Sequence, residues 1–188
     1  MTFASYADLE IGLDRVRAAP DDLGRLDMIV RRPAVDTREI LPVGRLDLVE
    51  GLVGDTWCTR PSRLTSDGSP HPDKQLNVMS ARFIALLAAD DVGRALAGDQ
   101  LYLDLDLSEA NLPAGSRLGL GDAVIQVTDQ PHRGCDKFAA RFGATALRLV
   151  NSPQGRALRL RGLCAKVVVP GTVSVGDEVR KLSALAMG

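Results

Sequence analysis

Residues 170–179 read PGTVSVGDEV, a short run of alternating apolar and polar residues interrupted by a glycine–aspartate pair. β-Branched residues at every second position favour a strand with one buried face, and Gly-Asp favours a tight turn. Residues 41–55 (LPVGRLDLVEGLVGD) and 113–122 (PAGSRLGLGD) have the same character and end in the same pair. The intervals between the three stretches are unequal, so they predict strands and turns but no repeat.

Further strands are predicted outward from these stretches, at residues 26–30, 101–107, 123–128 and 164–169. Helical spacing of apolar residues is confined to residues 8–17, 81–89 and 137–150, with Ser80 as a helix cap and a glycine break at residue 143. There are too few helices for βαβ crossovers. We therefore expect a mainly β fold, a closed or nearly closed barrel over about residues 25–182, with three or four short peripheral helices.

Composition limits the function classes. The chain has 188 residues, 45% of them hydrophobic and 25% charged, with a net charge of −1. These values are typical of one soluble domain and give no overall attraction to nucleic acid or to an anionic membrane. There is no apolar run of membrane-spanning length, and the first residues do not resemble a secretion signal. Three cysteines without framework spacing fit a reducing compartment, so we expect a cytoplasmic protein.

The most reactive candidate lies in residues 131–138, PHRGCDKF. Cys135 follows a predicted strand and a Pro/Gly turn and precedes a predicted helix. The positive end of the helix dipole, together with the neighbouring His132, Arg133 and Lys137, would favour the thiolate over the thiol. Thiolate attacks electrophilic sulfur and binds soft metals.

A packing role for Cys135 is the alternative. Cys135, Phe138 and Phe142 have the i, i+3, i+7 spacing of an apolar helix face, and free cysteine is often buried. Cys164, in an apolar strand, is predicted to be structural. Cys58 is a candidate for the rim of a pocket. Residues 59–74 are polar and long for a connection, so they predict either a functional or a mobile loop.

The ordered set of motifs resembles the MOSC domain, the module named after the C-terminal part of molybdenum cofactor sulfurase. The motifs are Gly54-Asp55, residues 98–101 (GDQL), 113–121, the single cysteine at 135, and residues 161–167 and 170–177. Gly134 stands where the family often has a proline directly before the cysteine. The resemblance assigns residues 40–182 to a MOSC-like barrel, 1–39 to a helix and strand extension packed on it, and 183–188 to a tail.

The resemblance implies a strongly bent barrel, similar to the pyruvate-kinase barrel, that carries sulfur on Cys135 or presents its thiolate to molybdenum. Cys135 is then the catalytic and metal-binding candidate, and the molybdenum cofactor, or molybdopterin, is the expected cofactor. Candidates to bind its pterin phosphate are Arg60, Arg63, Lys74, His132, Arg133 and Lys137. Pyridoxal phosphate is not expected, because no segment offers a recognisable Schiff-base lysine.

Three functions remain open at this stage. The first is a sulfur carrier or molybdenum-cofactor-binding enzyme component, with the cofactor or a sulfur-donor protein as partner. The second is a non-catalytic module that binds a small anionic metabolite or a protein partner. The third, a hydrolase or reductase with Cys135 and His132 as nucleophile and base, is the weakest, because no oxyanion-hole motif accompanies the pair. The oligomeric state is open.

Overall fold

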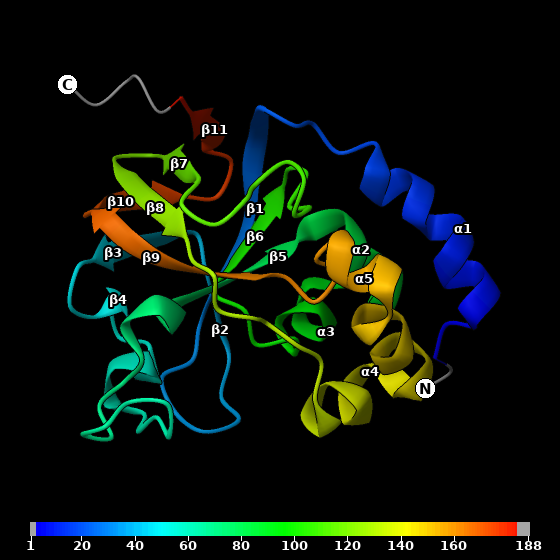
Figure 1. Ribbon diagram of the computed structural model, residues 1–188, viewed down its shortest axis with the longest axis horizontal. Helices are drawn as coiled ribbons and strands as arrows, with labels where there is room; N and C mark the ends of the chain where they lie inside the picture. Colours follow the sequence, from blue (N-terminus) through cyan, green and yellow to red (C-terminus); the bar gives the residue numbers. More distant parts are fainter. Residues whose placement is uncertain (1–2, 184–188) are drawn as a thin grey trace.

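Seven strands form a closed β-barrel in the computed structural model, which describes residues 3–183 (Figure 1). Their order around the barrel is β11-β7-β8-β9-β5-β6-β1, and pairing of β11 with β1 closes the ring. The strands are β1 (Leu23–Arg31), β5 (Leu76–Ser80), β6 (Leu101–Asp104), β7 (Arg117–Leu120), β8 (Ala123–Val127), β9 (Leu163–Val169) and β11 (Glu178–Leu182). Within this ring β5 and β6 are parallel and the other neighbours antiparallel. The predicted mainly β barrel with peripheral helices is confirmed.

Shorter strands extend this wall. β2 (Glu39–Leu41) pairs with β1, and β10 (Gly171–Ser174), β3 (Val43–Asp47) and β4 (Gly51–Leu52) form a second antiparallel sheet. The predicted Gly-Asp turns lie at strand ends, and Gly54, Gly121 and Gly176 all have positive φ. At the last of these turns Asp177 accepts a hydrogen bond from the amide of Ser174, 2.7 Å away. In these turns glycine thus supplies the positive φ, and Asp177 accepts a hydrogen bond from the backbone of its own turn.

Strand β1 contributes to two cores because it carries a bulge between Leu26 and Met28. Leu26 and Ile29 face the barrel interior, whereas Met28 and Val30 face outward into a second apolar cluster under the helices. The extra residue of a bulge shifts the alternation of side chains between the two faces of a strand. The barrel therefore has an apolar interior and one apolar outer face that the helices cover.

Five α-helices lie mainly on one side of the barrel (Figure 1): α1 (Tyr6–Arg17), α2 (Ala81–Leu87), α3 (Asp91–Ala95), α4 (Asp136–Asn151) and α5 (Pro153–Ala157). Two 3₁₀ turns, η1 (Thr56–Thr59) and η2 (Pro72–Lys74), flank the polar loop. Ser80 caps α2 as predicted. Three or four helices were predicted, and α3 and α5 were not among them. Each has five residues, and they begin at the cap residues Asp90 and Ser152. Such short helices have little apolar periodicity.

Helix α4 spans the two helical segments predicted on either side of residue 143. Gly143 has φ 90° and ψ 158°, so the helix is kinked there. Strand β6 is shorter than the predicted run 101–107, although Leu105 and Leu107 still point into the barrel core. No helix in residues 3–183 is long and apolar enough to cross a membrane.

The predicted division at residue 39/40 remains an expectation. In the fold, β1 comes from the predicted N-terminal extension and is one of the seven barrel strands, while α1 packs against the outside. The predicted tail lies outside the described residues, except for residue 183.

Candidate functional site

Cys135 lies where the loop after β8 enters α4, and it is the N-terminal cap residue of that helix. Its backbone is extended, and its carbonyl accepts hydrogen bonds from the amides of Phe138 and Ala139. Its side chain makes no capping hydrogen bond and is exposed, whereas Phe138 and Phe142 are buried. The thiol is therefore outside the apolar face of α4 and available to a ligand.

Gly134 holds this loop against the far end of the same helix. Its amide donates to Oδ1 of Asn151 (3.2 Å) and its carbonyl accepts from Nδ2 of Asn151 (3.1 Å). A Cβ at residue 134 would lie 2.7 Å from Val150 Cγ2 and 2.8 Å from Leu147 Cδ1. Any side chain at residue 134 would require Val150 or Leu147 to move, and a proline there would also remove the hydrogen bond from the residue 134 amide to Asn151.

Cys135 lines a cavity of about 440 Å³ between the start of α4, β5 and the loop after β1. We call it the Cys135 cavity. Among its lining residues six are cationic and one, Asp36, is anionic. The six are Arg32, Arg38, Arg60, Lys137, Arg141 and Arg161. Such an excess of positive charge around a concave site favours an anionic ligand.

Asp55 anchors the first of these arginines. Its carboxylate accepts from Nε (2.8 Å), Nη2 (2.7 Å) and the amide (2.9 Å) of Arg32, and Arg32 Nη1 donates to the Gly98 carbonyl. Both side chains are almost fully buried. Burial alone would raise the pKa of Asp55, but the hydrogen bonds and charge of Arg32 outweigh it and hold the pKa below its usual range. Arg32 is thus a rigid, charged part of the cavity wall.

Asp99 anchors a second arginine and also His132. Nη1 of Arg161 lies 2.9 and 2.7 Å from the two carboxylate oxygens, and Nε2 of His132 lies 2.7 Å from Oδ1. Asp99 is fully buried, yet the charge of Arg161 and then that of His132 outweigh burial and hold its pKa low. Burial, followed by the nearby Arg161 charge, lowers the pKa of His132. Arg161 also stacks over the Phe138 ring at 5.1 Å.

The remaining arginines are less firmly paired. Arg38 donates to the Thr37 carbonyl, and its Nε is enclosed without a partner. Burial and the charges of Arg141 and Arg32 lower the pKa of Arg38, and loss of hydration together with Arg32 lowers that of Arg60. Arg141 bonds the Leu96 carbonyl and a carboxylate oxygen of Asp36. Arg38 and Arg60 have no carboxylate partner within residues 3–183, and repulsion between neighbouring cations is relieved when an anion binds.

The structure brings together only part of the predicted set. Cys135, Arg60 and Lys137 line the Cys135 cavity. Arg63 and Lys74 do not line it, and Arg60 is the only residue of the loop 59–74 that does. His132 and Arg133 line a separate, smaller cavity.

Sequence reasoning missed Arg32, Arg38, Arg141 and Arg161 as cavity residues. The basic pair Arg31-Arg32 follows the strand predicted at residues 26–30, where it fits either a solvated strand end or a contact with an anionic ligand. The motif aspartates Asp55 and Asp99 were the available signal, because each binds one of these arginines. A buried aspartate in a turn motif requires a cation nearby.

The other cysteines differ from Cys135. Cys164 in β9 is buried, as predicted, and burial raises the pKa of its thiol to about 11. Cys58 is half-buried in η1 and does not line the Cys135 cavity. Within residues 3–183 no group of three or more His, Cys, Asp and Glu side chains is arranged to hold a metal ion.

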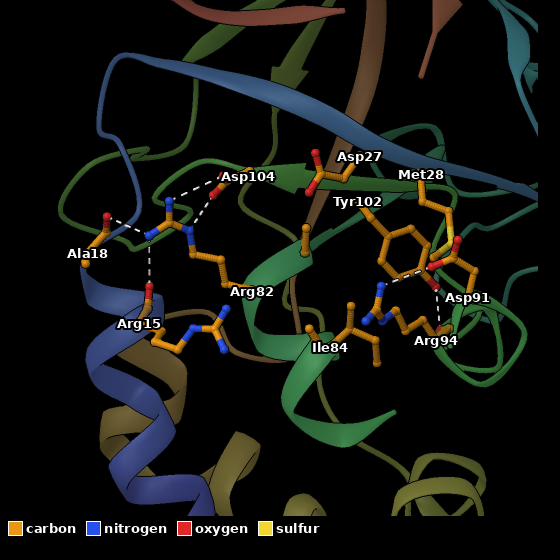
Figure 2. A pocket seen from close by; sticks show the side chains of 12 residues that line it. Arg15, Ala18, Asp27, Met28, Arg82, Ile84, Asp91, Arg94, Tyr102 and Asp104 are labelled. Carbon is orange, nitrogen blue, oxygen red and sulfur yellow. Dashed lines mark hydrogen bonds and ion pairs between the residues drawn. The ribbon is translucent and has the colours of Figure 1, made fainter. Parts of the chain in front are cut away.

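A larger cavity, about 470 Å³, lies between α1, α2, α3 and the outer face of β1 and β6 (Figure 2). Its lining includes three arginines and three aspartates but neither cysteine nor histidine. Arg82 is paired with Asp104 and bonds the carbonyls of Arg15 and Ala18, which end α1. These contacts hold the helix on the barrel, so we assign this cavity a structural role.

The fold and site define a closed β-barrel protein with an exposed cysteine at the edge of a cationic cavity. The family model for the MOSC domain matches residues 66–180, and the chain belongs to this family. The match includes Cys135, Asp99 and Arg161.

Solved structures agree at the level of the fold. The YUAD protein from Bacillus subtilis superposes with a TM-score of 0.59 at 17% identity, over 86% of this chain and 97% of its own. YiiM from Escherichia coli gives 0.54 at 22% identity, over 86% and 71%. YiiM from Geobacillus stearothermophilus gives 0.51 at 16% identity, over 85% and 75%. No curated protein gave a significant match.

Proposed function

We propose that this protein binds the molybdenum cofactor or a related anionic sulfur compound in the Cys135 cavity, with Cys135 as sulfur carrier or molybdenum ligand. One observation carries the proposal: an exposed thiol shares a cavity of about 440 Å³ with six cationic side chains and one carboxylate. Membership of the MOSC family makes molybdenum-cofactor chemistry the relevant context.

The residues that line the Cys135 cavity fit the molybdenum cofactor or a related anionic sulfur compound. Nε of Arg38 and of Arg161 are enclosed without a hydrogen-bond partner. Both atoms are fully enclosed, so it is the cationic side chains lining the cavity, Arg38, Arg60 and Arg141 among them, that suit an anionic ligand. A thiolate is a soft ligand that suits molybdenum in a sulfur-rich environment.

In this proposal the chain supplies three things. Arg38, Arg60 and Arg141 bind the anionic group, and Cys135 offers its sulfur at the mouth of the cavity. The pairs with Asp55 and Asp99 keep the wall in place. When bound, a molybdenum cofactor would supply a redox-active metal for oxygen- or sulfur-atom transfer.

Sulfur carriage requires a redox-neutral step on Cys135. The thiolate attacks the outer sulfur of a persulfide on a donor protein, the donor's S–S bond breaks, and the donor leaves as a thiolate. The new S–S bond leaves a persulfide on Cys135.

The test is direct analysis of the protein purified from a molybdenum-replete host. We expect molybdenum and pterin, or cyanide-labile sulfur, in an amount comparable to the protein. Cys135→Ser should remove the sulfur or the metal, whereas the matched control Cys58→Ser should retain it. Protein that carries neither group and takes no sulfur from a persulfide donor would contradict the proposal.

A non-catalytic anion-binding module is the second candidate, and the same six cations favour it. Such a module, unlike a sulfur carrier or a molybdenum-binding protein, would bind its anion without the thiol of Cys135. Under this alternative Cys135→Ser would bind the anion as well as the parent protein, while Arg141→Gln would bind it more weakly.

A further inference from the structure

His132 lies in a second cavity, of about 160 Å³, that neither the family match nor the proposed function assigns. We call it the His132 cavity. Its lining includes four arginines: Arg133, Arg156, Arg159 and Arg161. Two carboxylates, Glu109 and Asp129, also line it, and both residues are exposed. An internal space of this order holds a ligand of a few heavy atoms.

Two of the arginines are free to bind a ligand. Arg133 and Arg156 are exposed, and neither side chain has a hydrogen bond or ion pair within residues 3–183. Arg159 is held by the carbonyl of Leu112 at 2.6 Å, and Arg161 by Asp99. Guanidinium groups are well suited to oxyanions because their N–H groups match two oxygens at once.

The His132 ring adds an acceptor to this set of donors. Asp99 is held in its charged form by Arg161, so its oxygens can only accept hydrogen bonds. The 2.7 Å contact therefore assigns the ring proton to Nε2 of His132. In this neutral tautomer Nδ1 carries a lone pair. Nδ1 has no partner in residues 3–183 and is not among the polar atoms enclosed without one, and His132 lines the cavity, so we take Nδ1 as the ring atom available to a ligand there.

From this juxtaposition we propose that the His132 cavity binds a small oxyanion that keeps a hydroxyl proton at neutral pH, as hydrogen phosphate does. The arginines bind the charged oxygens, and His132 Nδ1 accepts the hydrogen bond from the hydroxyl. The site is separate from the Cys135 cavity, although Arg161 lines both. The inference does not depend on the proposed function.

The hydrogen-bond acceptor at His132 Nδ1 predicts which oxyanions the His132 cavity prefers. Sulfate has the same shape and charge as hydrogen phosphate but no proton near neutral pH, so its oxygens would face the Nδ1 lone pair. A phosphate monoester also loses its last proton above about pH 6. At pH 8 the cavity should therefore prefer inorganic phosphate to both sulfate and glycerol 3-phosphate. This comparison separates free phosphate from a phosphate group on a larger molecule.

The experiment is a titration of the full chain with inorganic phosphate at pH 8, followed by ¹H–¹⁵N NMR. The amides of Gly155 and Gly162 report on the His132 cavity, and that of Gly98 reports on the Cys135 cavity. The ¹⁵N shift of His132 Nδ1 reports directly on the hydrogen bond that it accepts. We expect saturable shifts at Gly155, Gly162 and Nδ1, weaker by about tenfold or more with sulfate.

Variants complete the test. Arg133→Gln and Arg156→Gln should each weaken the phosphate response at Gly155 and Gly162 by about tenfold or more, since each removes a charge-assisted hydrogen bond. Lys137→Gln, which removes a cation from the Cys135 cavity only, should leave this response unchanged. Equal affinity for sulfate and phosphate, unchanged affinity in both arginine variants, or no saturable shift at millimolar phosphate would each overturn the proposal.

Discussion

Arg161 and Asp99 form a buried ion pair in which one guanidinium nitrogen lies 2.9 and 2.7 Å from the two carboxylate oxygens. Arg161 lines both the Cys135 cavity and the His132 cavity, and Asp99 also holds His132. The Gly98-Asp99 turn after α3 thus organises two cavities at once. Because Asp99 is fully buried, its carboxylate cannot exchange these contacts for water.

Asp99→Asn should lower the free energy of unfolding by about 3–5 kcal/mol, because it leaves the Arg161 charge buried without its counter-charge. Denaturant titration measures the change. Asp129→Asn is the matched control: Asp129 is exposed and, within residues 3–183, bonded only to Gln130, so we expect a change within about 0.5 kcal/mol. Equal effects of the two substitutions would contradict the assigned role of Asp99.

His132 makes the protein sensitive to acid. Its pKa in the folded state is below 6.5, so below pH 6.5 the unfolded chain binds a proton that the folded protein does not. Stability must then fall as the pH is lowered from 6.5, by up to about 1.4 kcal/mol per pH unit. His132→Gln, whose amide can still donate to Asp99, should flatten this slope. His71→Gln should retain it.

The other groups that face His132 bear on this prediction. Burial and the charges of Arg161 and Arg32 oppose protonation of the ring, while Asp99 favours it; Glu109, Asp129 and the other arginines line the same cavity. Unfolding free energies measured between pH 7 and pH 5 provide the check. Identical slopes for the parent protein and His132→Gln would show that His132 is not held neutral.

Gly134→Ala should destabilise the loop before Cys135. The new Cβ would lie within 2.8 Å of Val150 and Leu147 side-chain atoms, and overpacking of this kind costs about 1–3 kcal/mol. Gly119→Ala is the control, because its Cβ would approach Leu182 no closer than 3.5 Å. Thermal melting compares the two, and a smaller loss for Gly134→Ala than for Gly119→Ala would refute the packing argument.

Thiol labelling should distinguish the cysteines. Cys135 is exposed and should react rapidly with a thiol reagent, whereas buried Cys164, with a pKa raised to about 11, should react only after unfolding. Cys135→Ser should change the unfolding free energy by less than about 1 kcal/mol. Cys164→Ser should cost about 1–3 kcal/mol, because it buries a more polar group. Mass spectrometry of the labelled peptides measures the rates, and equal rates in the native protein would contradict this assignment.

The features of the fold that were predicted correctly are those that a few neighbouring residues specify. The β-branched run in β8, the Gly-Asp turns and the Ser80 cap depend on neighbouring residues, so they could be predicted. The short helices α3 and α5 could not, because five residues are too few for apolar periodicity.

Of the residues that line the Cys135 cavity, Cys135, Arg60 and Lys137 were predicted from the sequence. Cys135 stands between a strand and a helix, and this position follows from the chain itself. The arginines around it come from distant segments, including residues 32, 38 and 141, and no local pattern marks them as neighbours.

The strands, the turns and the cysteine that begins a helix after a turn could be predicted from the chain alone, since each depends on residues a few positions apart. The cations at residues 32, 38, 141 and 161 that share a cavity with that cysteine, and the place of His132 in a different cavity, depend on contacts between distant segments. Closing the barrel brings Asp55 to Arg32 and Asp99 to Arg161 across 23 and 62 positions of the chain. Buried charges must find such partners wherever the fold provides them.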